Sequence, residues 1–109
     1  MPAQPSDGVY TFKPTDHFRR WTDGLDTMPK ALVAARIAMA RRGIPGKLLK
    51  DTGGIYELSV DTGPGYRLYY CQTGRTTFLL LTGGIKDDQL KDIKTAMKLH
   101  GRVKGGEHV

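Results

Sequence analysis

The chain has 109 residues, which is enough for one compact domain and too few for two, so a multidomain enzyme is excluded. It carries 17 Lys and Arg against 11 Asp and Glu, and this net charge of +6 favours a polyanionic partner such as nucleic acid. The single cysteine excludes an internal disulfide, and the longest uncharged run, residues 76–85, is too short to span a bilayer, so we expect a cytoplasmic protein without a membrane partner.

Residues 1–8 contain two prolines and no basic stretch ahead of an apolar run, so we expect a flexible lead and no signal peptide. The β-formers of Val9–Lys13 predict a short strand that Pro14 stops. Thr15 can then cap the N-terminus of a helix that runs to about Leu25.

A second helix is expected after the break at residues 26–29 and continues to about Arg42. Val33, Ile37 and Ala40 form its buried line, and Gly43 is suited to its C-terminal end. The two helices together predict a helical hairpin.

After residue 44 the pattern changes to short segments separated by turns. Residues 55–60, 66–72 and 76–82 have the composition of strands, and the turn-forming runs between them predict an antiparallel meander. The run at residues 78–81 has no polar alternation, so we expect it to be buried on both faces of the sheet.

Gly83-Gly84 is expected to form a turn into a last helix from about Asp87 to His100. In this helix Leu90, Ile93 and Met97 would face the core. Gly101 would end it, and residues 101–109 would form a flexible C-terminal tail.

The fold class is therefore α+β, with one domain over residues 9–100. It consists of a short N-terminal strand, a helical hairpin, a mostly antiparallel sheet of four or five strands and a C-terminal helix. We expect the helices to lie against one face of the sheet and the other face, which carries Arg67, to lie open.

Arg67 is the most informative single residue. Strand alternation places its side chain in the middle of the sheet, on the face opposite to the one that carries Leu68 and Tyr70. Its simplest interpretation is an ordinary surface arginine. A phosphate-binding role gains weight because lysines flank the same sheet, and an exposed tyrosine beside them could stack on a base. The candidate RNA-binding residues are Lys47, Lys50 and Tyr69, with Lys86 near the end of the last strand.

Several kinds of site find no support in the sequence. The three histidines lie on separate elements, so no metal site is expected. The chain has no phosphate-binding loop motif for a nucleotide cofactor. Cys71 has no neighbour in sequence that would lower its pKa, and a lone cysteine on a strand usually has a packing role.

Three segments carry a resemblance to a known family. They are Gly54–Leu58, the run Gly63-Pro64-Gly65-Tyr66-Arg67, and the run Leu79–Lys86 with Gln89 behind it. Together they resemble the addiction-module killer branch of the RelE/HigB toxins within the RelE/ParE superfamily, over Tyr10 to about Leu99.

The resemblance implies a RelE-like fold and a toxin of a type II toxin–antitoxin system. Such a toxin enters the ribosomal decoding site and cuts messenger RNA without a metal or other cofactor, by turning the ribose 2′-OH on the adjacent phosphate. Arg67 and Lys86 match positions expected to act on that phosphate as catalytic residues. The resemblance also implies a cognate antitoxin, which is a helix-turn-helix DNA-binding protein. The toxin would then contact operator DNA only through this antitoxin.

Two positions depart from the family pattern: Ser59 stands where members commonly have arginine, and Ile85 where they have aspartate. The general base stays open among Glu57, Asp92, Lys50 and His100. The same fold also serves ParE-type toxins, which inhibit DNA gyrase by contact, so a non-enzymatic inhibitor and an inactive antitoxin-binding relative are the alternative interpretations.

Overall fold

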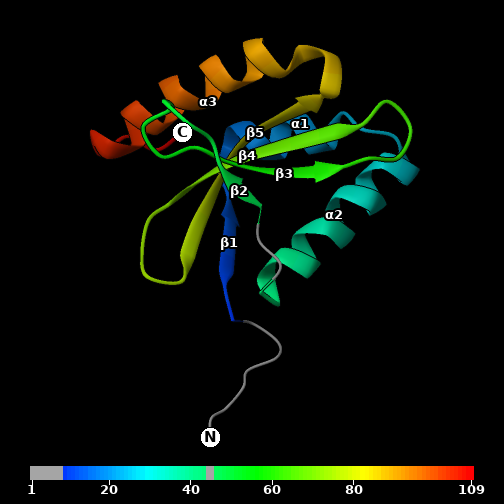
Figure 1. The fold of residues 1–109 in the computed structure, drawn as a ribbon, viewed down its shortest axis with the longest axis horizontal. Coiled ribbons are helices and arrows are strands. Elements are labelled where there is room, and N and C mark those ends of the chain that lie inside the picture. Colours follow the sequence, from blue (N-terminus) through cyan, green and yellow to red (C-terminus); the bar gives the residue numbers. More distant parts are fainter. Residues whose placement is uncertain (1–8, 44–45) are drawn as a thin grey trace, which may run out of the picture.

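The structure is a computed structural model that describes residues 9–43 and 46–109. The expected flexible lead at residues 1–8 lies outside the described residues, as does Ile44, where the sequence pattern changes. A five-stranded sheet forms the centre of the domain, with helices on both of its faces (Figure 1). The elements in chain order are β1 (Thr11–Pro14), α1 (Asp16–Asp23), α2 (Thr27–Arg41), β2 (Lys47–Leu48), β3 (Tyr56–Val60), β4 (Tyr66–Gln72), β5 (Thr77–Ile85), the 3₁₀ turn η1 (Lys86–Asp88) and α3 (Gln89–Lys104).

The strand order is β1-β5-β4-β3-β2, and every neighbouring pair is antiparallel except β1 and β5. The predicted α+β class and the mostly antiparallel sheet are therefore confirmed. β1 includes Pro14, which we expected to lie just after the strand. An edge strand tolerates proline, because the missing N–H can face away from its one neighbour.

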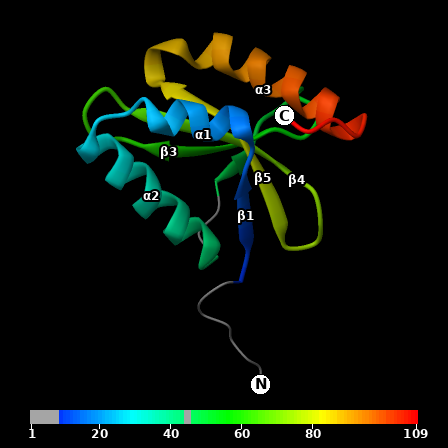
Figure 2. The same ribbon diagram turned by 180° about the vertical axis from the view of Figure 1, so that it is seen from behind.

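The helical hairpin of α1 and α2 forms as the sequence predicts (Figure 2). The Thr15 side chain accepts a hydrogen bond from the Phe18 backbone N–H at 3.1 Å, which caps α1. Gly43 follows α2 with a φ of +101°, a left-handed conformation that glycine adopts without strain.

The hairpin packs on one face of the sheet and forms the larger core. Its helices contribute Phe18, Val33 and Ala40. The strands contribute side chains that alternate toward this face, namely Leu58, Val60, Tyr66, Leu68, Tyr70, Phe78 and Leu80.

Helix α3 covers part of the opposite face, so the expectation that all helices lie on one face is wrong. Ala96 and Leu99 are its buried residues, whereas Leu90 and Met97 are 81% and 39% exposed. Ile93 packs against the second core as predicted, so the predicted apolar stripe is wrong for Leu90 and Met97. Gly101 does not end the helix, which continues to Lys104.

Gly83 and Gly84 lie inside β5 and do not form the expected turn. They pair with Leu68 and Arg67 of β4. A Cβ at Gly83 would overlap the ring of Trp21, and a Cβ at Gly84 would overlap the carboxylate of Asp92. The two glycines therefore allow α1 and α3 to approach the strand closely from its two faces.

The last residues, which we expected to form a flexible tail, return to the start of α1. The carbonyl of Val109 accepts a hydrogen bond from the His17 backbone N–H at 3.1 Å, and the Val109 side chain is buried. The His108 ring lies 2.8 Å from the Asp16 carboxylate. Among the described residues, no helix combines the length and the apolar character needed to cross a membrane.

Candidate functional site

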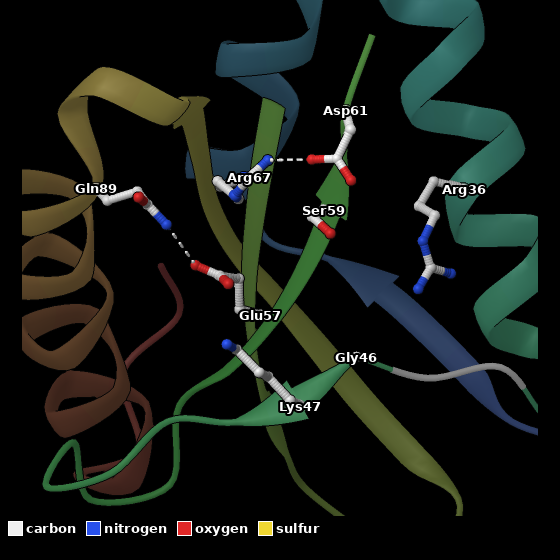
Figure 3. A pocket seen from close by; sticks show the side chains of 8 residues that line it. All are labelled: Arg36, Gly46, Lys47, Glu57, Ser59, Asp61, Arg67 and Gln89. Carbon is white, nitrogen blue, oxygen red and sulfur yellow. Dashed lines mark hydrogen bonds and ion pairs between the residues drawn. The ribbon is translucent and has the colours of Figure 1, made fainter. Parts of the chain in front are cut away.

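An open cleft of about 500 Å³ lies on the α3 face of the sheet, beside the part that α3 covers (Figure 3). Strands β3 and β4 form its floor, β2 and α2 lie at one side, and the start of α3 lies at the other. Its lining residues are Arg36, Gly46, Lys47, Glu57, Ser59, Asp61, Arg67 and Gln89.

Arg67 is buried on the floor of the cleft, with 8% of its surface exposed. The expectation that it lies on an open face is therefore wrong, although the cleft gives access to it. Its Nη1 donates to the Tyr66 carbonyl at 3.1 Å and lies 3.2 Å from Oδ1 of Asp61, whose side chain is 79% exposed. The guanidinium is thus held by the backbone, and its carboxylate partner is an exposed surface group that another anion can replace.

Glu57 lies on β3, two residue pairs along the ladder from the pair of Ser59 and Arg67, and is also buried. In the register Glu57 is opposite Tyr69 on β4 and Lys47 on β2, while Ser59 is opposite Arg67. The Gln89 side-chain amide donates a hydrogen bond to Oε2 of Glu57 at 3.1 Å. Glu57 is therefore the general-base candidate that the fold places in the same cleft as Arg67.

The cleft combines three positive side chains with two negative ones. The cations are Arg36, Lys47 and Arg67, and the anions are Glu57 and Asp61. A site with buried and exposed cations around a carboxylate can bind a phosphodiester and accept a proton from a neighbouring hydroxyl.

Lys86 is exposed and lies near Arg67, although it is not among the residues that line the cleft. Its backbone N–H donates to the Gly65 carbonyl at 2.7 Å. A Cβ built on Gly65 would lie 3.3 Å from Lys86 Cβ and 3.6 Å from Arg67 Nη1, so both side chains lie close to this glycine. The structure thus brings Lys47 and Lys86 to the surroundings of Arg67.

Lys50 lies elsewhere, in the turn after β2, where residues 48–54 surround a separate small cavity. It does not line the cleft with Arg67. Its expected RNA-binding role therefore gains no support from its position.

Tyr69 is fully buried, so the expectation that it is exposed and stacks on a base is wrong. It packs with Cys71, Leu81, Ala96 and Leu99 in a second core beneath α3. Alternation does place it on the same face as Arg67, but α3 covers this half of that face. Burial, and then the negative charges of Glu57 and Asp92, raise the pKa of the Tyr69 hydroxyl, which is neutral at physiological pH.

The other general-base candidates lie outside the cleft. Asp92 lines a different cavity, between α1 and α3, and burial raises its pKa. The His100 ring lies near Gly54, and burial lowers the pKa of the ring. Burial also raises the pKa of Cys71 to about 11, which makes it a poor nucleophile at neutral pH. The described residues contain no group of three or more His, Cys, Asp and Glu that could hold a metal ion.

Four residues of the cleft were not predicted from the sequence to belong to it, namely Arg36, Gly46, Asp61 and Gln89. Of these, Gln89 alone belongs to the segments that carry the family resemblance. The sequence does offer a signal for Gln89, because this residue follows Lys86 by three positions in the run that carries the resemblance and stands at the start of a helix. Its partner could not be predicted, since Glu57 is 32 residues away.

Comparisons with known proteins give a relative by sequence and solved structures by fold. The chain is 39% identical to an uncharacterized protein of Haemophilus influenzae over 88 residues, which are 80% of this chain and 89% of that protein. The structure of a mutant of the Escherichia coli toxin RelE in the free state superposes with a TM-score of 0.67 at 11% identity, covering 82% of this chain and 94% of that one. No family model matches the chain. At this identity the likeness to the solved structure shows a shared fold.

Proposed function

Since this chain belongs to the same family as the uncharacterized Haemophilus influenzae protein and has the fold of RelE, we propose that it is the toxin of a type II toxin–antitoxin module. In this proposal it is an mRNA interferase of the HigB kind, which cleaves messenger RNA on the ribosome in the cytoplasm. Its partners are the ribosome, messenger RNA and a cognate helix-turn-helix antitoxin, which carries the contact with operator DNA. The observation that supports cleavage best is the buried Arg67 beside Glu57 in one open cleft.

The spacing of these two groups suits the reaction. Glu57 and Arg67 are diagonal neighbours across β3 and β4, because Ser59 is the residue directly opposite Arg67. Diagonal neighbours lie roughly 7–8 Å apart, and their Cβ atoms are somewhat closer. A ribose 2′-hydroxyl can reach the carboxylate at this separation while the adjacent phosphate contacts the guanidinium.

The proposed chemistry needs no cofactor. Glu57 takes the proton of the 2′-hydroxyl, and the 2′-oxygen forms a bond with phosphorus. Arg67, with Lys47 and Lys86 at the rim, stabilises the negative charge of the phosphorane. The bond from phosphorus to the 5′-oxygen then breaks, and this oxygen takes a proton from solvent. The products are a 2′,3′-cyclic phosphate and a 5′-hydroxyl.

Ser59, where relatives commonly have arginine, lies on the cleft floor directly opposite Arg67. Arg36 and Lys47 line the same cleft and add positive charge around this position. We propose that these two residues compensate for the arginine that is absent at position 59.

The proposal is tested in a cell-free translation reaction in which new 5′ ends of messenger RNA are mapped. We expect cuts that depend on translation, and Arg67→Ala should reduce the cleavage rate about 10²- to 10³-fold because a fixed donor to the phosphorane is lost. Arg67→Lys should recover only part of the rate, since the planar guanidinium is absent. Because Arg67 is buried, urea unfolding must show that each variant is folded at the assay temperature.

The matched control is Arg75→Ala, which removes an exposed arginine in the turn after β4, at the other end of the strand from Arg67. This variant should cleave like the wild type. Equal rates for Arg67→Ala and the wild type would show that the phosphate is held elsewhere. Inhibition of gyrase supercoiling without any RNA cleavage would support a ParE-type inhibitor, and no effect in either assay would support an inactive relative.

A further inference from the structure

We propose that Gln89 is a positioning residue, which keeps the Glu57 carboxylate turned into the cleft in competition with the buried hydroxyl of Tyr69 beside it. This inference rests on the proposed function for its effect on the reaction. Its structural part, a competition between two donors for one carboxylate, stands on the contacts alone.

The first donor is the Gln89 amide, whose Nε2 lies 3.1 Å from Oε2 of Glu57. Gln89 is the first residue of α3, so the helix fixes its backbone at the edge of the cleft. Figure 3 shows the Glu57 side chain, from the floor of the cleft, and the Gln89 side chain, from the start of α3, pointing toward each other. The hydrogen bond spans the gap between the sheet and the helix, and it uses one carboxylate oxygen.

The second donor is the Tyr69 hydroxyl, which is buried and has no hydrogen-bond partner in the part of the chain that the structure describes. Tyr69 lies directly opposite Glu57 in the β3–β4 register. A buried hydroxyl without a partner is unfavourable, so a carboxylate that turned toward it would be stabilised. The phenol keeps its proton, because burial and the nearby carboxylates raise its pKa, and it is therefore always able to donate.

Glu57 thus lies between a donor at the cleft and a donor beneath α3. With Gln89 present, its carboxylate is held at the cleft. Without the amide, the unsatisfied Tyr69 hydroxyl is the buried donor beside the carboxylate, and Lys47, opposite Glu57 on β2, is an exposed one. Because the buried hydroxyl has no water to bond to, Glu57 would turn into the second core. The base would then be out of reach of the ribose 2′-hydroxyl, although every residue of the reaction would still be present.

The test is a double-mutant cycle measured as single-turnover cleavage on ribosomes with bound messenger RNA. Gln89→Met keeps the length of the side chain and removes the donor. We expect it to reduce the rate about tenfold, within the range of measured coupling energies, without changing the affinity for the ribosome. In the background of Tyr69→Phe, where the competing donor is absent, the same change should reduce the rate less than about threefold.

Two further variants control for general effects of the substitution. Gln72→Met makes the same chemical change at the far end of β4 and should leave the rate unchanged. Gln89→Ala should behave like Gln89→Met if the donor, and not the bulk of the side chain, is what matters. An equal loss from Gln89→Met in both backgrounds, or no loss in either, would overturn the proposal.

A crystal structure of the Gln89→Met variant tests the inference without any assay of activity. We expect the Glu57 carboxylate within hydrogen-bond distance of the Tyr69 hydroxyl, and an unchanged Glu57 would overturn the proposal. The Glu57→Gln variant separates this failure from that of the proposed function. If Glu57→Gln cleaves like the wild type, Glu57 is not the base, whereas the crystal structure still decides whether Gln89 positions it.

Discussion

The two faces of the sheet differ in how far helices cover them. On the hairpin face, α1 and α2 pack on a continuous apolar surface that includes Leu58, Leu68 and Tyr70. On the opposite face, α3 covers only one part, where Tyr69 and Cys71 are buried, and the neighbouring part is the polar cleft. The same strands therefore support a large apolar core on one face. On the other face they support a smaller core beneath α3 and the polar cleft beside it.

This difference shows how a small domain can hold charged groups in fixed positions. Glu57 and Arg67 have neighbours on the same strands, Leu58 and Leu68, that are fully buried in the hairpin core. The backbone that carries the two polar side chains is therefore anchored from the other face. Groups that are placed before substrate arrives stabilise a transition state at a low cost of reorganisation.

The largest expected effect is on the free energy of unfolding, which should fall much more for a substitution on the hairpin face than for one on the cleft face. Leu68→Ala removes a fully buried side chain and should lower the free energy of unfolding by about 2–5 kcal/mol. Ser59→Ala, on the cleft face of the neighbouring strand, should change it by less than about 0.5 kcal/mol. Urea unfolding measures both, and equal losses would show that the cleft face contributes to stability as much as the hairpin face does.

A smaller effect is expected from the exposed partner of Arg67. Asp61 occupies Nη1 of the guanidinium at 3.2 Å, so a phosphate must displace it. Asp61→Asn should therefore tighten binding of a non-cleavable RNA about two- to fivefold, the range expected for an exposed ion pair. Fluorescence anisotropy at fixed salt measures this affinity. Weaker binding would indicate that Asp61 orients Arg67 for the substrate.

The smallest expected effect is the pH dependence of stability that Asp92 of α3 causes. Burial raises the pKa of Asp92 in the folded state above its value in the unfolded chain. The stability that the protonated form contributes is present at pH values below the unfolded pKa, and it is lost as the pH rises through the folded pKa. Asp92→Asn should therefore raise the melting temperature at pH 7 and leave it nearly unchanged at pH 3. A lower melting temperature at pH 7 would show that the charged carboxylate stabilises the fold.

Local signals in the sequence predicted much of the fold. The N-cap at Thr15, the bounds of β4 and the glycine after α2 each depend on a few neighbouring residues, and the structure confirms them. Strand alternation also placed Ser59 and Arg67 on one face, and the register makes them direct neighbours.

Features that depend on packing between distant elements could not be predicted in this way. Tyr69 alternates with Tyr70 like an exposed residue, and only the position of α3 shows that it is buried. Gly83 and Gly84 are typical turn residues, and only their contacts with Trp21 and Asp92 explain why they lie in a strand. The pair of Gln89 and Glu57 depends likewise on where α3 begins relative to β3.

The central claim is that this cleft cleaves messenger RNA by attack of a ribose 2′-hydroxyl. It is tested most directly with ribosomes that carry a message with a single 2′-deoxynucleotide at the mapped cut site, beside the same message with ribose there. We predict that the wild-type protein cleaves the ribose message to a 2′,3′-cyclic phosphate and leaves the deoxy message intact at that position. Cleavage of both messages at the same site and rate would contradict the account.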